Sequence, residues 1–206
     1  MGLFLCMTPS LLRAEPPLET VGGKSQPPSF AEVEETPPEN VVFSFLRGLP
    51  EAQVERRKKG KSIGGRWNEK GFQFEDSDPG VMEIFAHEQT TVSGKNRGAV
   101  WMLAKSGSES SLAFLKVPPG RSLRFFYALP DYVFEPRGKA QPAFVQVEIL
   151  IGKKKVFEGQ TNTKGWKEKT LDLTLPYLLQ RDYQITIRVR SLDPEPRYFV
   201  FYGYIQ

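Results

Sequence analysis

The sequence predicts an all-β chain, folded as an antiparallel β-sandwich of the jelly-roll type behind a disordered Pro/Glu-rich N-terminal tether. The clearest observation is strict alternation of apolar and polar residues at 145–149, 171–175 and 183–189. A period of two is typical of half-buried antiparallel strands. Turn-like segments separate these runs at the spacing expected of a sandwich, at 152–155, 159–165 and 191–196. No segment shows a convincing amphipathic helical pattern.

The folded domain is expected to begin at residue 41, where 41–46 forms the first apolar run after a proline-rich segment. Residues 50–55 fit either one helical turn or an irregular strand, and we favour the strand. The run 56–61 is predicted to be a basic loop, and alternation returns at 71–74.

Further strands are expected wherever apolar residues alternate or cluster between turn residues. They are 81–86, 99–104, 111–117, 122–129, 143–151, 154–159, 169–175, 183–191 and 198–205. Pro118, Pro119 and Gly120 predict a turn, because proline presets φ and glycine adopts positive φ. A longer loop is expected over 130–142 and a short helical turn over 177–180. About ten strands without a fixed repeat favour two packed antiparallel sheets.

Residues 15–40 are predicted to be an extended linker. They hold three Pro-Pro pairs, several glutamates and almost no large apolar side chains. Such a segment cannot bury enough surface to offset its chain entropy. Proline pairs favour a semi-rigid, extended chain. The predicted β-sandwich domain therefore spans residues 41–206.

Residues 1–14 are predicted to be a secretory signal peptide. The segment 2–12 is short and apolar, and Ala14 is the small residue expected at a cleavage site. The segment lacks a basic start, which fits a truncated leader or a misassigned start codon. The sole cysteine, Cys6, lies within it, so cleavage would leave a mature chain without cysteine. No other apolar run approaches the ~18 to 20 residues of a membrane span, and we expect a secreted or periplasmic protein.

Charge is unevenly distributed along the chain. The formal net charge is +4, but residues 1–40 hold two basic and six acidic residues, a subtotal of −4, which leaves +8 for residues 41–206. A basic domain attracts nucleic acid, anionic polysaccharide or membrane surfaces, although a basic surface that only confers solubility explains the charge as simply. The run 56–61 carries no interleaved aromatic residues, and export would separate it from nucleic acid. We therefore expect no nucleic-acid partner.

Residues suited to acid–base or nucleophilic catalysis are scarce. The chain has one histidine, His87, which we expect to pack or to satisfy a loop rather than act as a base. Without a second histidine, a mature cysteine or a Gly-x-Ser-x-Gly elbow, Ser-His and Cys-His hydrolysis are disfavoured. A carboxylate-pair glycosidase stays open, because the sequence does not show which carboxylates face each other. We predict that the protein is not an enzyme.

Three tryptophans are candidate sugar platforms, because glycan binding sets planar aromatic faces against the apolar side of a sugar ring. Trp67 lies in the polar, glycine-flanked segment 64–71 and is expected in an exposed loop, with Asn68 beside it as a hydrogen-bonding group. Trp166 is also expected in a loop, and Trp101 in the core. For each tryptophan, simple burial is the alternative.

Polar groups in neighbouring loops are candidates to complete a sugar site. Arg97 and Asn96 lie in the turn-like segment 93–98, and Asp131 and Tyr132 follow a predicted strand. Arginine, asparagine and aspartate supply the hydrogen bonds that sugar hydroxyls require. The sequence does not show which of these loops meet.

The acidic turn 75–80 is a candidate calcium site. It brings Glu75, Asp76 and Asp78 close together in sequence, and Ca²⁺ prefers oxygen ligands. The turn matches no defined calcium loop, so a solvated acidic turn is the simpler interpretation. We expect no other cofactor.

The order of several motifs resembles that of the galactose-binding-like jelly rolls, the group that includes discoidin-type domains and many carbohydrate-binding modules. The motifs are Phe45-Leu46, Gly71-Phe72, Ala86-His87, Val117-Pro118-Pro119-Gly120, Trp166 with Leu171-Asp172-Leu173, and the terminal run 199–205. The resemblance covers roughly residues 41–206. It implies a sandwich that binds a glycan, a lipid head group or a protein, and similar jelly rolls often hold a structural calcium. Fold likeness alone does not fix function.

We therefore predict a secreted, non-catalytic carbohydrate-binding module that recognises glycans through loops containing Trp67 and Trp166. The alternative is a structural or protein-interaction domain of the bacterial cell envelope with no sugar site. A groove with two aromatic residues and several polar groups would favour a sugar. A flat apolar patch would favour a protein partner.

Overall fold

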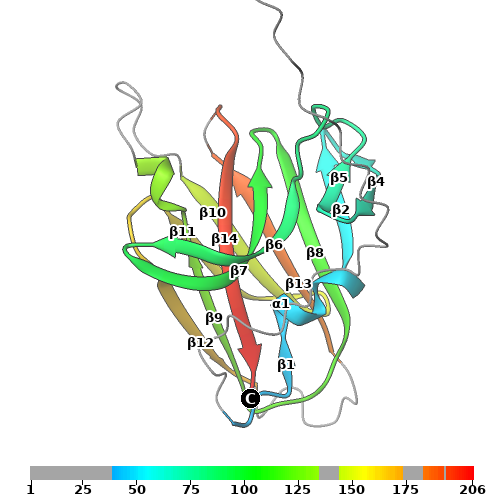
Figure 1. The fold of residues 1–206 in the computed structure, drawn as a ribbon. Coiled ribbons are helices and arrows are strands. Elements are labelled where there is room, and N and C mark those ends of the chain that lie inside the picture. The colour runs from blue at the N-terminus through cyan, green and yellow to red at the C-terminus, as the bar shows by residue number, and fades with distance from the viewer. Residues whose placement is uncertain (1–38, 135–143, 174–182, 193) are drawn as a thin grey trace, which may run out of the picture.

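The computed structural model of the chain describes residues 39–134, 144–173, 183–192 and 194–206 (Figure 1). Within these residues two antiparallel sheets pack face to face, which confirms the predicted all-β sandwich. The predicted leader 1–14, residues 15–38 of the linker, most of the loop 130–142 and the turn 177–180 lie outside the described residues. Among the residues described, no helix is long and apolar enough to cross a membrane.

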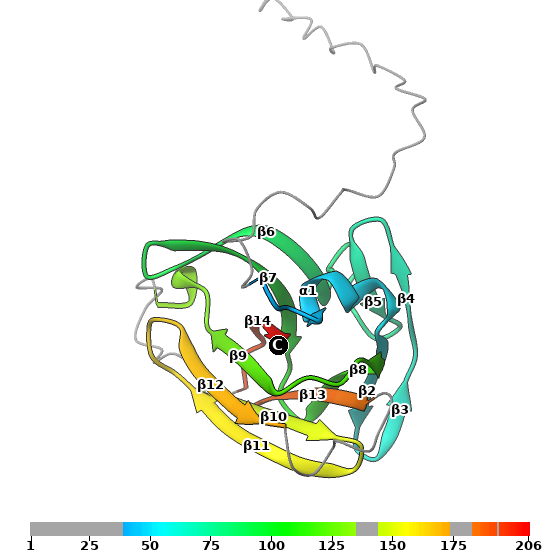
Figure 2. The same cartoon turned by 90° about the horizontal axis from the view of Figure 1, so that it is seen from below.

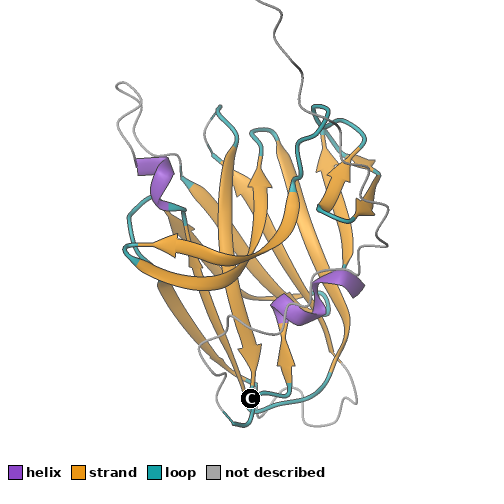
Figure 3. Cartoon of the chain, viewed as in Figure 1, coloured by secondary structure: helices purple, strands orange, loops and turns teal. Residues whose placement is uncertain are grey.

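The larger sheet has eight strands (Figure 3). Its path runs through β12 (Lys167–Asp172), β9 (Ser122–Ala128), β14 (Arg197–Ile205), β7 (Lys95–Ala104), β6 (Ile84–Val92), β5 (Gly71–Phe74) and β4 (Gly65–Asn68). The short strand β1 (Phe43–Ser44) pairs with the end of β14.

The smaller sheet has six strands. Their order is β11 (Lys154–Thr161), β10 (Val145–Ile151), β13 (Tyr183–Ser191), β8 (Ser108–Val117), β2 (Gln53–Lys58) and β3 (Lys61–Ile63). Three short helical segments accompany the sheets: α1 (Phe45–Gly48), η1 (Leu49–Glu51) and η2 (Asp131–Phe134). Seen from below, α1 lies beside β5 at the rim of the larger sheet (Figure 2).

Alternation along the strands builds the core. On β9, Leu123, Phe125 and Tyr127 point between the sheets, whereas Arg124 and Phe126 are only partly buried. A side-chain period of two produces this division of each strand into an inner and an outer face. The larger sheet therefore carries a buried apolar face inside and a second, mixed face outside.

The apolar run 41–46 is extended only in part. Only Phe43–Ser44 is extended, and the chain then turns into α1 and η1. Phe45, Leu46 and Leu49 are all buried. Adjacent residues of a strand point to opposite faces, whereas positions i, i+1 and i+4 share one side of a helix. A helical turn is therefore needed to bury all three.

The predicted basic loop at 56–61 is also wrong. β2 continues to Lys58 and β3 begins at Lys61, with a tight turn at Lys59 and Gly60, both at positive φ. Arg56 belongs to the inward-facing side of β2 and its side chain is 0% exposed. The run is therefore a hairpin whose first arginine is a buried structural residue.

Strands β6 and β7 are longer than predicted. They continue through the polar residues 88–98 and form a hairpin that turns at Ser93 and Gly94. Figure 1 shows this hairpin crossing in front of β14 and β9. Val92 and Ala99 pack there against Ala128 and Val200 in a small second apolar cluster. The outer face of the larger sheet is therefore partly covered by its own hairpin.

Candidate functional site

Trp67 lies on a strand and not in a loop, which corrects the predicted placement. It is part of β4, pairs with Phe72 across the β4–β5 hairpin and is 37% exposed. Its ring meets that of Phe72 edge to face, with centroids 5.3 Å apart. The indole is therefore held by its neighbour while part of it remains accessible to solvent.

Asn68 holds the turn of this hairpin. Its Oδ1 accepts hydrogen bonds from the backbone N–H groups of Lys70 at 2.8 Å and Gly71 at 3.2 Å. An asparagine side chain that bonds its own backbone in this way is a common turn device. Asn68 therefore fixes the position of Trp67, and its carbonyl oxygen is already engaged.

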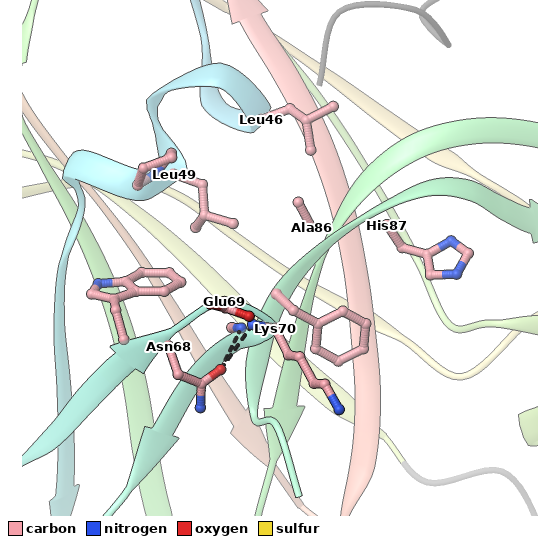
Figure 4. A pocket seen from close by; sticks show the side chains of 11 residues that line it. Leu46, Leu49, Asn68, Glu69, Lys70, Ala86 and His87 are labelled. Atoms are coloured by element: carbon pink, nitrogen blue, oxygen red, sulfur yellow. Dashed lines mark hydrogen bonds between the residues drawn. The ribbon is translucent and has the colours of Figure 1, made fainter. Parts of the chain in front are cut away.

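A cavity of about 540 Å³ lies beside Trp67, between the β4–β5 hairpin, β6 and the α1–η1 segment; we call it the β4–β6 pocket. Figure 4 shows Leu46 and Leu49 on one side of it, Asn68, Glu69 and Lys70 on the other, and His87 farther along β6. The eleven lining residues are Leu46, Leu49, Pro50, Trp67, Asn68, Glu69, Lys70, Gly71, Phe85, Ala86 and His87. Ligand sites of this size hold small molecules.

The pocket has an apolar wall and a polar rim. Leu46, Leu49 and Pro50 form the wall together with Trp67 and Phe85. The rim carries the polar residues Asn68, Glu69 and Lys70, and His87, which is exposed to solvent, also lines the pocket. Two aromatic rings with several polar groups around them form the combination that suits a sugar ring.

Gly71 allows the close approach of β5 and β6 that shapes the pocket. A Cβ at this position would lie 2.5 Å from the carbonyl oxygen of Ile84 and 2.8 Å from the Cβ of Phe85. We expect Gly71→Ala to push the strands apart and to cost about 1–3 kcal/mol of unfolding free energy. Gly80→Ala is the matched control, because Gly80 also has positive φ but nothing within 4 Å of its Cβ position.

Urea denaturation followed by tryptophan fluorescence measures both glycine variants. Gly80→Ala is expected to lose about 1–2 kcal/mol, the cost of a left-handed backbone alone. If Gly71→Ala is no less stable than Gly80→Ala, the close approach of β5 to β6 does not constrain the pocket.

Arg97 and Trp166 lie away from this pocket, on the outer face of the larger sheet. Arg97 Nη1 donates a hydrogen bond to the hydroxyl of Tyr202 at 2.6 Å. Trp166 meets the same tyrosine edge to face, with centroids 5.0 Å apart, and packs against the second apolar cluster. Neither residue lines the β4–β6 pocket. The predicted partnership of Trp67 with Trp166 in one site is therefore not what the structure shows.

Asp131 and Tyr132 belong to η2 and support the β6–β7 hairpin. The Asp131 carboxylate accepts the Ser93 N–H at 2.9 and 3.0 Å, which holds the hairpin turn. The ring of Tyr132 is parallel to that of Trp101, with centroids 6.3 Å apart. The Asp131 carboxylate, which was predicted to bond a sugar hydroxyl, therefore bonds the Ser93 N–H.

Trp101 lies on the outer face of β7 and not in the central core, because its neighbours Val100 and Met102 point inward. Its Nε1 donates to Thr90 Oγ1 at 2.7 Å, and its ring stacks on Phe85 with centroids 5.5 Å apart. Phe85 also lines the pocket. An aromatic row on β6 and β7 therefore extends from the pocket along the outer face.

The acidic turn 75–80 is held by an ion pair between Asp76 and Arg56. Asp76 Oδ1 accepts Arg56 Nη1 at 3.0 Å, and its other oxygen lies 3.6 Å from Lys58 Nζ. Burial alone would raise the pKa of Asp76, but the hydrogen bond and positive charge of Arg56 outweigh it and hold that pKa below its ordinary value. Asp76 thus neutralises a buried guanidinium.

Glu75 and Asp78 are not grouped with Asp76 in the described part of the chain. Across the part of the chain that the structure describes, no group of three or more His, Cys, Asp or Glu side chains is arranged to hold a metal ion. Calcium binding by this turn stays a prediction. The positive charge that the Asp76 carboxylate faces in the structure is that of Arg56.

The walls of the pocket were not found from the sequence. In the sequence, strands β2 and β3 lie between Leu49 and Trp67, and Phe85 follows later, on β6. The only signal for them was the apolar character of 41–46 and 81–86, which fits burial equally well. These residues come together with Trp67 only in the folded chain.

Comparison with known proteins gave matches only among solved structures. No family model matches the chain, and no curated protein matches it. The CBM51 module of Clostridium perfringens GH95, solved with methyl-galactose, is similar with a TM-score of 0.43 and 13% identity, over 64% of this chain and 94% of that one. TmCBM61, solved with β-1,4-galactotriose, has a TM-score of 0.37 and 13% identity, over 60% and 82%.

A third similar structure is the K2 cleaved adhesin domain of Lys-gingipain, with a TM-score of 0.38 and 14% identity, over 60% of this chain and 83% of that one. All three similarities are at low sequence identity. With TM-scores this modest, any functional proposal rests on the residues of the β4–β6 pocket itself.

Proposed function

We propose that the protein is a secreted, non-catalytic carbohydrate-binding module whose ligand is a glycan held in the β4–β6 pocket. The observation that supports this most is a partly exposed Trp67 beside a cavity of about 540 Å³ that Phe85 also lines. Sugar rings present an apolar face and a polar edge, and this pocket offers aromatic faces and a polar rim in matching positions.

Each part of the pocket has a defined task in this proposal. The Trp67 ring stacks on the apolar face of one sugar unit, and Phe85 contacts its far side. Lys70, Glu69 and His87 bond the hydroxyl groups at the rim. Leu46 and Leu49 exclude water from the opposite wall, which strengthens those hydrogen bonds.

The test is the affinity of the full chain for a broad panel of immobilised neutral and sulfated glycans, repeated with Trp67→Ala. We expect one sugar class to bind and Trp67→Ala to weaken it about tenfold, or about 1.4 kcal/mol. Trp67→Phe should retain part of the affinity. The melting temperature of Trp67→Ala should stay close to that of the parent, because the indole is partly exposed.

Leu192→Ala is the matched control, because Leu192 is apolar, 58% exposed and does not line the pocket. It should bind glycan like the parent. Unchanged binding by Trp67→Ala would place the sugar elsewhere, and a collapse of its melting temperature would mean that the indole is a core residue.

A protein partner is the second candidate, because Leu46, Leu49, Pro50 and Ala86 give the pocket a largely aliphatic wall. An apolar side chain of an envelope protein would fill such a wall without using the polar rim. Substitution separates the two functions. Lys70→Ala and His87→Ala should weaken a glycan strongly but leave an apolar side chain nearly unaffected.

A further inference from the structure

A strip of aromatic and arginine side chains lies on the outer face of the larger sheet. We call it the β9–β14 strip; its members are Arg97, Arg124, Phe126, Tyr202 and Tyr204. All five are partly exposed, and none lines the β4–β6 pocket. Alternation places the strip outside, because Phe125, Phe201 and Gly203 take the inward positions between its members.

The aromatic rings of the strip pack against one another and against two arginines. Phe126 and Tyr202 stack with centroids 4.5 Å apart and planes 4° apart. The guanidinium carbon of Arg124 lies 5.2 Å from the Phe126 centroid and 5.8 Å from that of Tyr204. Arg97 lies over Tyr202 at 5.3 Å. The strip therefore combines two cations with partly exposed aromatic rings whose faces already contact one another or a guanidinium.

Such a surface suits one kind of peptide. Proline-rich segments dock on aromatic grooves because the extended proline helix is already rigid and its rings pack on aromatic faces. Glutamates within that segment would pair with the arginines of the strip. A peptide that carries Pro-Pro pairs interleaved with glutamates therefore matches both features at once.

This chain contains such a segment. Residues 15–39 hold three Pro-Pro pairs and six glutamates, and the part nearest the domain reads Glu34-Glu35-Thr36-Pro37-Pro38-Glu39. The net charge of residues 1–40 is −4 against +8 for the rest. Charge complementarity thus favours contact between the two parts of the chain.

The folded part begins beside the strip. The Val42 N–H donates to the Ile205 carbonyl at 2.8 Å, and Ser44 pairs with Tyr204. Glu39 and Asn40 lie in a turn just before this pairing. Because β1 is antiparallel to β14, the chain before Phe43 leads past Ile205, and the segment must turn back to reach Tyr202. The 25 residues 15–39 span up to about 80 Å when extended, which is long enough for this return.

We propose that the acidic, proline-rich segment 15–39 docks on the β9–β14 strip of its own chain. Its prolines pack against the exposed parts of the Phe126 and Tyr202 rings, and its glutamates reach Arg97 and Arg124. Arg124 already donates its Nε to Glu168 at 2.9 Å. A guanidinium has five N–H donors, so a second carboxylate can bind its other edge.

The test attaches a nitroxide spin label to the full-length chain at Ser29→Cys, in a Cys6→Ser background. Backbone amide signals of β9 and β14 on the strip side should lose most of their intensity, while those of β10 and β11 should not. About 0.5 M salt should restore the signals, because the Debye length then falls to a few ångströms. Uniform broadening, or none, would overturn the proposal.

Charge reversal makes the test specific. Glu34→Lys with Glu35→Lys should abolish the broadening, Arg124→Glu should do the same, and combining all three should restore it. Glu168→Gln is the control for loss of the existing Arg124 pair and should leave the broadening intact. Failure of the triple variant to recover would contradict docking through these charges.

A mixed sample separates this proposal from an interface between copies. Isotope-labelled chain without nitroxide is mixed with unlabelled chain that carries it. Intramolecular docking predicts no broadening in the mixture. Broadening of the strip in that sample would overturn the proposal and indicate that a second copy supplies the segment.

Discussion

Glu83→Ala is expected to lower the free energy of unfolding by about 3–5 kcal/mol. Glu83 is fully buried, and its carboxylate accepts Lys105 Nζ at 2.6 Å and also pairs with Arg56 and Ser77. Arg56, itself fully buried, comes from the opposite sheet. Removing the carboxylate leaves a buried guanidinium with Asp76 as its remaining carboxylate partner.

Urea denaturation with and without a compensating change measures this effect. Arg56→Met combined with Glu83→Leu should recover most of the loss, because an apolar pair avoids the desolvation of two buried charges. Glu55→Ala is the control for an exposed ion pair, that with Arg57, and should cost no more than about 1 kcal/mol. A Glu83→Ala variant as stable as the control would show that the buried network does not join the sheets.

Phe45→Ala is expected to cost a similar amount, about 3–5 kcal/mol. Phe45 is fully buried, and its ring meets Phe114 edge to face with centroids 4.9 Å apart. It also rests on Gly203, where an added Cβ would lie 3.1 Å from the ring. The residue anchors α1, so its loss should also loosen Leu46 in the wall of the pocket.

Stability and glycan affinity should therefore fall together in Phe45→Ala. Phe144→Ala is the matched control, because Phe144 is 47% exposed and should change stability by less than about 0.5 kcal/mol. A Phe45→Ala variant that keeps its affinity at a reduced melting temperature would mean that α1 does not shape the pocket.

The strands with one face in the core between the two sheets were predictable from the sequence. The expected range 183–191 coincides with β13, and 122–129 and 154–159 come close to β9 and β11. These strands have one face buried against the opposite sheet, so burial imposes alternation on their sequences. In these strands, burial of one face stabilises the fold and also produces the alternation that the sequence shows.

Elements without that constraint were missed or misplaced. The residues of β4 are all exposed, and β6 beyond Ala86 is mostly exposed, so no core face imposes a pattern on them. Arg56 was misplaced for the opposite reason. It occupies an inward, buried position on β2, but its charge favours the prediction of an exposed loop. Its partners, Glu83 and Asp76, are distant in sequence and give no local signal.

The site was predictable only in part. Trp67 and Asn68 do lie at one cavity, but Arg97 and Trp166 lie on the outer face with Tyr202, and Asp131 holds a turn. Composition identified residues of the right chemistry without placing them relative to one another. The pocket depends on Leu49 and Phe85 meeting the β4–β5 hairpin in space, and this is a property of the fold.

The most direct test of the central claim uses the three tryptophans as reporters. Each indole N–H gives its own signal in a nitrogen–proton correlation spectrum, which is recorded while a glycan from the bound class is added to the full chain. A glycan in the β4–β6 pocket should move the Trp67 signal in a saturable way and leave that of Trp166 in place. A shift of Trp166 with Trp67 unmoved, or no shift of any indole by any glycan, would contradict the assignment of a sugar to this pocket.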